Sequence, residues 1–270
     1  MSILSGLRKL HVPPSAILIA AILIAAFSAA TTSYANQQTK PRNQDLVLEF
    51  KLSNKGSVPW PSNQVTIFVK GKKSRMELAL IGGPPMMPKG PLSVSILDGE
   101  TGESVGLFPM NKTYIKVSHE EAKESKDLLF GMSQKWGGIP AERPELEATD
   151  EVRELRGQKA RKYIGSNQRQ QLVYWIIDTE DWREVARRVA LATATPAGSL
   201  LNMQFPDIER TPGFPVIVEI AMDMPQMGTV VSTTELIDYK WTTLGHHLFE
   251  IPDDYEATER KLFVIPGGGS

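Results

Sequence analysis

The chain has 270 residues, with 30 Lys and Arg against 31 Asp and Glu, 41% hydrophobic residues, 7% aromatic residues and no cysteine. The missing thiols exclude a disulfide-stapled scaffold and a cysteine-ligated metal or iron–sulfur site. The near-neutral charge lacks the basic footprint of a nucleic-acid binder. We therefore expect a domain held by its own apolar core, with no cofactor and no nucleic-acid partner.

The first 35 residues have the pattern of an export signal. An uncharged apolar run of 12 residues, Ala16 to Phe27, follows two basic residues. It is shorter than the roughly 20 residues that cross a membrane and suits the core of a signal peptide. We expect cleavage near Ala35 and a periplasmic or secreted product that does not span the membrane; no cysteine follows the run, which excludes lipid attachment there. The alternative is an uncleaved signal anchor.

After a polar lead at 36–43, apolar residues recur at every second position in a series of short runs, which indicates half-buried strands. The basic turn at 70–73 and the Asp98-Gly99 pair indicate hairpins. The predicted strands lie at 46–52, 65–69, 74–80, 92–97, 105–108, 113–117, 160–164, 171–178, 215–222, 229–239 and 248–251. The charged segment 141–156 is predicted to connect the two groups of strands.

Helical spacing appears in two places. Ser118 and Glu121 have the spacing of a capping box, and Thr179 precedes Trp182 and further apolar residues at helical intervals. A third helical piece is expected at 198–205. We predict an α+β domain, mainly antiparallel β, over 44–256: an incomplete curved β-barrel with two to three helices packed against its concave face, followed by a tail at 257–270.

Gly102-Glu103-Ser104-Val105-Gly106 matches G-x-S-x-G, the nucleophile elbow of serine hydrolases. That elbow requires a strand directly before the serine and a helix directly after it. Here Asp98-Gly99 breaks the preceding strand and another strand-like run follows. We interpret the motif as a chance match in a hairpin turn and expect no enzymatic activity.

Methionine is the one soft metal ligand available. Met222, Met224 and Met227 would suit Cu(I), although methionine also lines adaptable apolar surfaces. His246 and His247 would point to opposite faces of a strand and so would not share a metal. We expect no metal site and keep Cu(I) binding by these methionines as an alternative.

Three segments carry a family resemblance: 68–77, then 96–99 and 108–114. Together they resemble the hairpins of the LolA/LolB-like outer-membrane lipoprotein carriers, and more closely an uncharacterised exported branch of that group, a domain of unknown function. Later segments agree, at 157–163, 174–178, 212–215 and 248–255. The resemblance implies a LolA-like incomplete barrel closed by a helical lid around an apolar cavity, which in the carriers holds acyl chains. Arg75 is the nearest match to an arginine that helps to hold the lid in those carriers.

A curved sheet facing helices would form a pocket. The leading hypothesis is a non-enzymatic periplasmic binding or carrier protein for an acyl chain, lipid or lipoprotein, with an envelope protein as a further candidate partner. The alternatives are a cell-envelope structural or interaction module with a filled core, and periplasmic Cu(I) binding. The candidate cavity residues are Phe68, Met76, Leu128, Leu129, Trp175, Trp182, Met222 and Met224.

Overall fold

The computed structural model of this chain describes residues 44–56, 62–81, 90–124, 144–167, 170–193, 208, 211–224 and 228–258, with the side chains of 191–193 and 224 left out. The predicted signal peptide, polar lead and third helical piece lie outside these residues. Leu128, Leu129, Met227 and most of the predicted tail lie outside them too.

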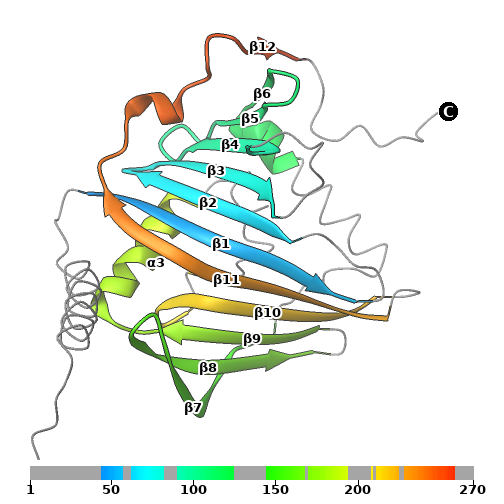
Figure 1. The fold of residues 1–270 in the computed structure, drawn as a ribbon, viewed down its shortest axis with the longest axis vertical. Coiled ribbons are helices and arrows are strands. Elements are labelled where there is room, and N and C mark those ends of the chain that lie inside the picture. Colours follow the sequence, from blue (N-terminus) through cyan, green and yellow to red (C-terminus); the bar gives the residue numbers. More distant parts are fainter. Residues whose placement is uncertain are drawn as a thin grey trace, which may run out of the picture. The chain divides into compact units, whose positions relative to one another are not determined.

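A twelve-stranded sheet organises the described residues (Figure 1). All neighbouring strands are antiparallel except β12 and β6, which are parallel. The order across the sheet is β12 (Glu256–Ala257), β6 (Thr113–Val117), β5 (Ser104–Phe108), β4 (Ser93–Asp98), β3 (Lys73–Leu80), β2 (Asn63–Lys70), β1 (Asp45–Lys55), β11 (Gly228–Thr242), β10 (Phe214–Met224), β9 (Gln170–Ile177), β8 (Gln158–Ser166) and β7 (Glu147–Leu155).

The sheet is curved and unclosed, with β12 and β7 at its two edges. Arg156, in the turn between β7 and β8, donates a hydrogen bond from Nε to the Leu236 carbonyl oxygen of β11 at 3.1 Å. That bond reaches across three strands, which requires strong curvature. The predicted fold class, mainly antiparallel with an incomplete barrel, is confirmed.

Two helices begin where the sequence predicts. The Ser118 hydroxyl accepts the Glu121 N–H at 3.3 Å and the Glu121 carboxylate accepts the Ser118 N–H at 2.9 Å, which is a capping box opening the helical residues 119–124. Helix α3 spans Glu180–Thr193, and the Thr179 carbonyl accepts the first helical hydrogen bond, from Arg183 N–H at 2.9 Å. Two acidic residues in the first turn of α3 interact favourably with the positive end of the helix dipole.

The largest core cluster, here called the α3 core, joins α3 to one face of the sheet. Trp182 is its centre: its ring lies 5.6 Å from the Phe214 ring and 4.7 Å from the Tyr239 ring. Other buried members come from α3 and from alternate positions of β1 and β2, which share one face: Val185, Ala186, Val189, Leu46, Leu48, Phe50, Leu52, Val65, Ile67 and Val69. The helix therefore covers the part of this face that β1 and β2 form.

The opposite face has its own cover. Val47 stands between Leu46 and Leu48 in β1, so its side chain lies on the opposite face. There it belongs to one buried cluster with Val94, Ile96, Leu107, Leu244 and Phe249. The chain that follows β11, including the 3₁₀ helix η2 (His246–Phe249), thus closes the outer side of β1–β5. A third cluster lies on β9 and β10 and contains Leu172, Tyr174, Ile176, Val218 and Ile220.

Two predictions of secondary structure are wrong. Residues 248–251 were expected as a strand, but η2 occupies His246–Phe249, because Leu248 and Phe249 pack down onto the sheet beside them. The segment 141–156 contains a strand, β7, where no strand was predicted. Its side chains are mostly charged and exposed at the sheet edge, so they carry no apolar alternation for a sequence pattern to detect.

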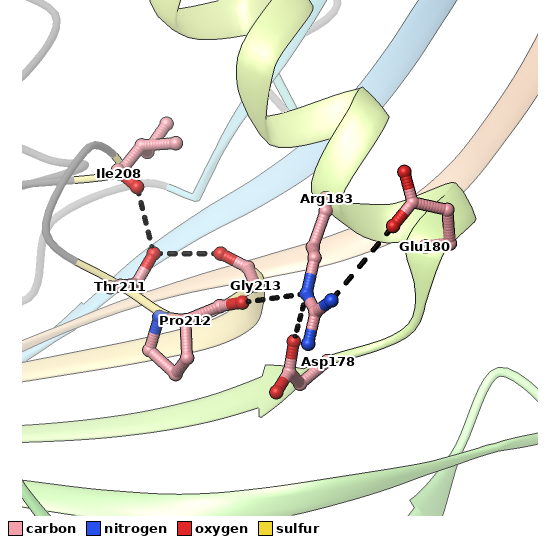
Figure 2. A network of polar contacts seen from close by, with 7 residues as sticks. All are labelled: Asp178, Glu180, Arg183, Ile208, Thr211, Pro212 and Gly213. Carbon is pink, nitrogen blue, oxygen red and sulfur yellow. Dashed lines mark hydrogen bonds and ion pairs between the residues drawn. The ribbon is translucent and has the colours of Figure 1, made fainter.

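A polar network joins the end of β9, the start of α3 and the entry to β10 (Figure 2). Arg183 Nε donates to Asp178 Oδ1 at 2.7 Å and to the Pro212 carbonyl oxygen at 3.4 Å. The Thr211 hydroxyl lies 2.7 Å from the carbonyl oxygen of Gly213, which packs directly on the Ile177–Asp178 backbone. This network sets the angle at which α3 leaves the sheet.

Replacing Gly213 with alanine tests that close approach. A Cβ at Gly213 would lie 2.2 Å from the Ile177 carbonyl oxygen, so two backbones would have to separate. We expect Gly213→Ala to lower the free energy of unfolding by about 2–3 kcal/mol, measured by urea denaturation.

Gly106→Ala is the matched control, because a Cβ there meets no heavy atom within 4 Å. It should change stability by no more than about 0.5 kcal/mol. Equal losses in the two variants would contradict the role assigned to Gly213.

The β4–β5 turn is held by the Asp98 carboxylate, which accepts the N–H groups of Glu100 at 2.9 Å and Thr101 at 3.3 Å. Lys73 Nζ lies 3.4 Å away. Burial by itself would raise the pKa of Asp98, but the two N–H bonds and Lys73 outweigh it and hold the pKa below its ordinary value. The folded state therefore favours the charged carboxylate.

A group with a lowered pKa stabilises the fold above its unfolded-state pKa, and this contribution disappears as the pH falls through the folded-state pKa. We expect Asp98→Asn to be less stable than the unchanged chain at pH 7, and the difference to close as the pH falls below about 4. Urea midpoints at pH 7 and pH 3 measure both. Glu103→Gln removes an exposed carboxylate from the same turn; an equal loss in this variant would assign the effect to net charge instead.

Candidate functional site

The two tryptophans predicted to line a cavity lie in the packed α3 core. Trp175 is 4% exposed and Trp182 is 3% exposed. The Arg153 guanidinium lies 3.6 Å from the centre of the Trp175 ring, and Lys162 Nζ lies 5.8 Å from it. Both cations come from the β7–β8 hairpin, so this hairpin covers the indole through cation–π contacts. In the described structure the two rings are core residues.

The other cavity candidates separate into different clusters. Met76 is half-buried at the border of the α3 core, whereas Phe68 packs with the cluster on the opposite face and Met222 with the cluster on β9 and β10. For Met224 only the backbone is described, at the end of β10. The structure therefore does not bring Phe68, Met76 and Met222 together around one cavity.

Arg75 holds a cover, but on the face opposite α3. Its Nη1 donates to the Leu248 carbonyl oxygen of η2 at 2.9 Å, and its Nε binds Glu77 at 2.7 Å. The Lys70 ammonium makes a similar contact with the Leu244 carbonyl. Both side chains fix the segment that follows β11, so the cover held by Arg75 is the carboxyl-terminal segment.

A different set of residues lies on strands β3 to β6, on the same face of the sheet as α3. Met76 pairs with Ile67 of the α3 core, and the same row continues through Ser95 and Gly106 to Ile115. Leu78 and Ser93 form the adjacent row. All are half-buried. We call this set the β3–β6 strip: Met76, Leu78, Ser93, Ser95, Gly106, Phe108 and Ile115.

The residues at the centre of the strip, Ser95 and Gly106, are small. Space lies open above Gly106, since a Cβ there would have no neighbour within 4 Å. Ser95 beside it adds only a hydroxymethyl group, while Met76 and Ile115 stand at the two ends of the row. The strip thus has small residues at its centre and larger apolar side chains at its two ends.

Charge is absent from this face of the four strands. The charged residues of β3 and β6 alternate with the strip residues and so lie on the opposite face: Lys73, Arg75, Glu77 and Lys116. None of the strip side chains is ionisable. Such a surface offers nothing to bind an ionic group and suits an apolar ligand.

Sequence reasoning missed Ser93, Ser95, Gly106 and Ile115 as site residues. A signal was present, because Ser93 and Ser95 are small residues at alternate positions of a strand whose other positions are Val94 and Ile96. That pattern places small residues on one face and apolar residues on the other.

The described residues supply no evident centre for chemistry. Gly102 lies in the β4–β5 turn at φ 75°, and Ser104 begins β5 with no helix after it, so the G-x-S-x-G motif occupies a hairpin as expected. In this part of the chain no cluster of three or more His, Asp or Glu could hold a metal ion. His246 and His247 are exposed in η2. Copper binding by Met222, Met224 and Met227 stays a prediction.

Within the described ranges, no helix is both long enough and apolar enough to cross a membrane.

No protein-family model matches the chain, and no curated protein matches its sequence. Among solved structures, PNGF-II is similar with a TM-score of 0.37 and 12% identity over 81% of this chain, which spans only 31% of the PNGF-II chain. A DUF1329 family protein from Desulfovibrio piger is similar with a TM-score of 0.34 and 9% identity, over 81% of this chain and 93% of that chain. A domain assigned as an outer membrane lipoprotein-sorting protein, from Vibrio parahaemolyticus, has a TM-score of 0.32 and 9% identity, over 81% and 94% of the two chains.

Proposed function

We propose that this chain is a non-enzymatic binding or carrier protein for a hydrophobic ligand, namely an acyl chain of a lipid or lipoprotein. The observation that carries the proposal is the β3–β6 strip: a half-buried, uncharged surface on the face of the sheet on which α3 packs. Contiguous apolar surface that stays accessible often marks a binding site.

The shape and chemistry of the strip favour an acyl chain over a polar ligand. Hydroxyl groups of Ser93 and Ser95 are its only side-chain polar atoms, and small residues leave room along the row from Met76 to Ile115. Each methylene that leaves water contributes about 0.8 kcal/mol. Affinity should therefore rise with chain length until the strip is filled.

We infer the compartment from the sequence and an acceptor from the proposed carrier role. The export pattern of residues 1–35 supports action in the periplasm or outside the cell. A carrier of acyl chains has to hand them on, so we infer an envelope protein or membrane surface as the acceptor.

One observation favours a second candidate, a structural or interaction module with a filled core. The aromatic residues of the α3 core are packed against one another, with Phe50 and Phe214 6.4 Å apart in addition to the Trp182 contacts. In that case the strip would be the border of the core and would bind no acyl chain.

A fluorescent fatty acid separates the two candidates. We expect dansyl-undecanoic acid to bind the unchanged protein with an increase and blue shift of its emission, and Gly106→Phe to weaken binding about tenfold or more, equivalent to about 1.4 kcal/mol. The added ring would fill the open space above Gly106.

Lys116→Phe is the matched control, because it adds the same ring on the neighbouring strand at an exposed position of the opposite face. It should leave probe affinity unchanged. Absence of probe binding to the folded, unchanged protein would remove the carrier function and favour the filled-core module. Equal weakening by both variants would place the site elsewhere.

A further inference from the structure

Strands β7 and β8 form a hairpin at one edge of the sheet (Figure 1), and on one face of this hairpin two cations lie over the same indole. The Arg153 guanidinium is 3.6 Å from the centre of the Trp175 ring, and Lys162 Nζ is 5.8 Å from it. Lys162 pairs with Trp175 directly, whereas Arg153 pairs with Ala160. Because Ala160 carries only a methyl group, it leaves Arg153 room to cross β8 and lie on the indole.

The two cations differ in their partners. Lys162 Nζ lies 2.8 Å from Glu151 Oε2, so a carboxylate already balances its charge. Arg153 is exposed, and in the part of the chain that the structure describes its guanidinium has neither a carboxylate nor a carbonyl partner. The charge of Arg153 is therefore available to an anion from solution.

Stacking on the indole leaves the hydrogen-bonding groups of Arg153 free. The N–H donors of a guanidinium lie in its plane, and a contact at 3.6 Å from the ring centre uses only its face. The ring beneath is fixed, since Trp175 is 4% exposed and belongs to the α3 core. A planar donor fork on a rigid support suits two-point binding of a phosphate or carboxylate group.

An exposed apolar side chain lies on the same face of β8. Ile164 is two positions beyond Lys162, so the two side chains point to the same side of the sheet. Ile164 is 40% exposed and pairs with Val173 of β9, which packs at the border of the α3 core. The surface beside the two cations therefore offers apolar contact as well as charge.

Two of the acidic residues of β7 lie away from Arg153. Glu154 pairs with Lys159, and both alternate with the row of Arg153 and Ala160, so they lie on the opposite face. Glu147 pairs with Ile164 and shares the face, but it stands six residues from Arg153, about 20 Å along the strand. Neither carboxylate occupies the position of an anion bound to Arg153.

We propose that Arg153, stacked on Trp175, binds an oxyanion, namely a phosphate or carboxylate group. A lipid headgroup and free phosphate both supply this chemistry, and the exposed Ile164 favours the lipid, whose alkyl chain it contacts. The site is separate from the β3–β6 strip, because five strand spacings, about 24 Å along the sheet, lie between β9 and β3. It therefore does not rest on the acyl-chain function proposed for the strip.

Isothermal titration calorimetry in a phosphate-free buffer tests the site with two probes, butyl phosphate and inorganic phosphate. We expect butyl phosphate to bind the unchanged protein about tenfold more tightly, because about two methylenes that leave water beside Ile164 supply this factor. Equal affinities would support the oxyanion site and identify free phosphate as its ligand. Absence of binding of both probes to the folded protein would overturn the proposal.

Arg153→Met removes the charge but keeps an unbranched side chain over the Trp175 ring. We expect it to weaken butyl phosphate binding about tenfold or more. Arg161→Met is the matched control, because Arg161 is exposed on the same hairpin but alternates with Ala160 and Lys162 and so lies on the opposite face. It should leave the affinity unchanged. Equal weakening by the two variants would assign the binding to net charge and overturn the site.

Arg153→Lys tests the geometry of the site. This variant keeps a cation over the indole but loses the planar donor fork. We expect it to bind butyl phosphate about threefold or more weakly than the unchanged protein. Full affinity in the lysine variant would overturn the two-point contact. Circular dichroism and urea denaturation of all three variants show that each is folded before it is compared.

Discussion

An apolar face of a sheet stabilises a fold only where it is covered, and in the described part of this chain the sheet is far larger than helix α3, which packs on one of its faces. Twelve strands at about 4.8 Å spacing extend over roughly 50 Å, measured along the curve. Helix α3 has 14 residues and is about 21 Å long. The helix seals the centre of one face, where Trp182 meets Phe214 and Tyr239. Curvature reduces the area to be covered, and the Arg156 bond to β11 shows how strongly this end of the sheet bends.

On the opposite face the cover is not a long helix but the segment that follows β11. The segment after β11 returns over β1–β5, buries Phe249 and is anchored through its backbone carbonyls by Lys70 and Arg75. Anchoring through carbonyl groups does not depend on which side chains the segment carries. Among the described residues, those of the β3–β6 strip are half-buried, and the residues at its centre are small and uncharged. The candidate site is thus an uncharged part of the sheet face on which α3 packs.

The large apolar side chains named as cavity candidates fall into different clusters of the structure. Trp175 and Trp182 are conspicuous in the sequence, but they pack into the core because aromatic rings gain most from full burial. Binding space arises where side chains are small, and a glycine such as Gly106 attracts notice in a sequence only as part of a motif. The strand register adds that it shares a row with Ser95 and Ile115, which is why we propose it as part of the site.

The sequence by itself determined most of the strands, the capping box at Ser118 and the start of α3, because these depend on local periodicity and on hydrogen bonds within a few residues. It did not reveal β7, whose exposed edge carries no apolar alternation, or η2, whose apolar residues pack from a loop. Only the tertiary structure decided which apolar residues form the core, on which face Arg75 binds the carboxyl-terminal segment and which small residues share a row. Those outcomes depend on strand register, which joins residues far apart in the chain and is not encoded in any single segment.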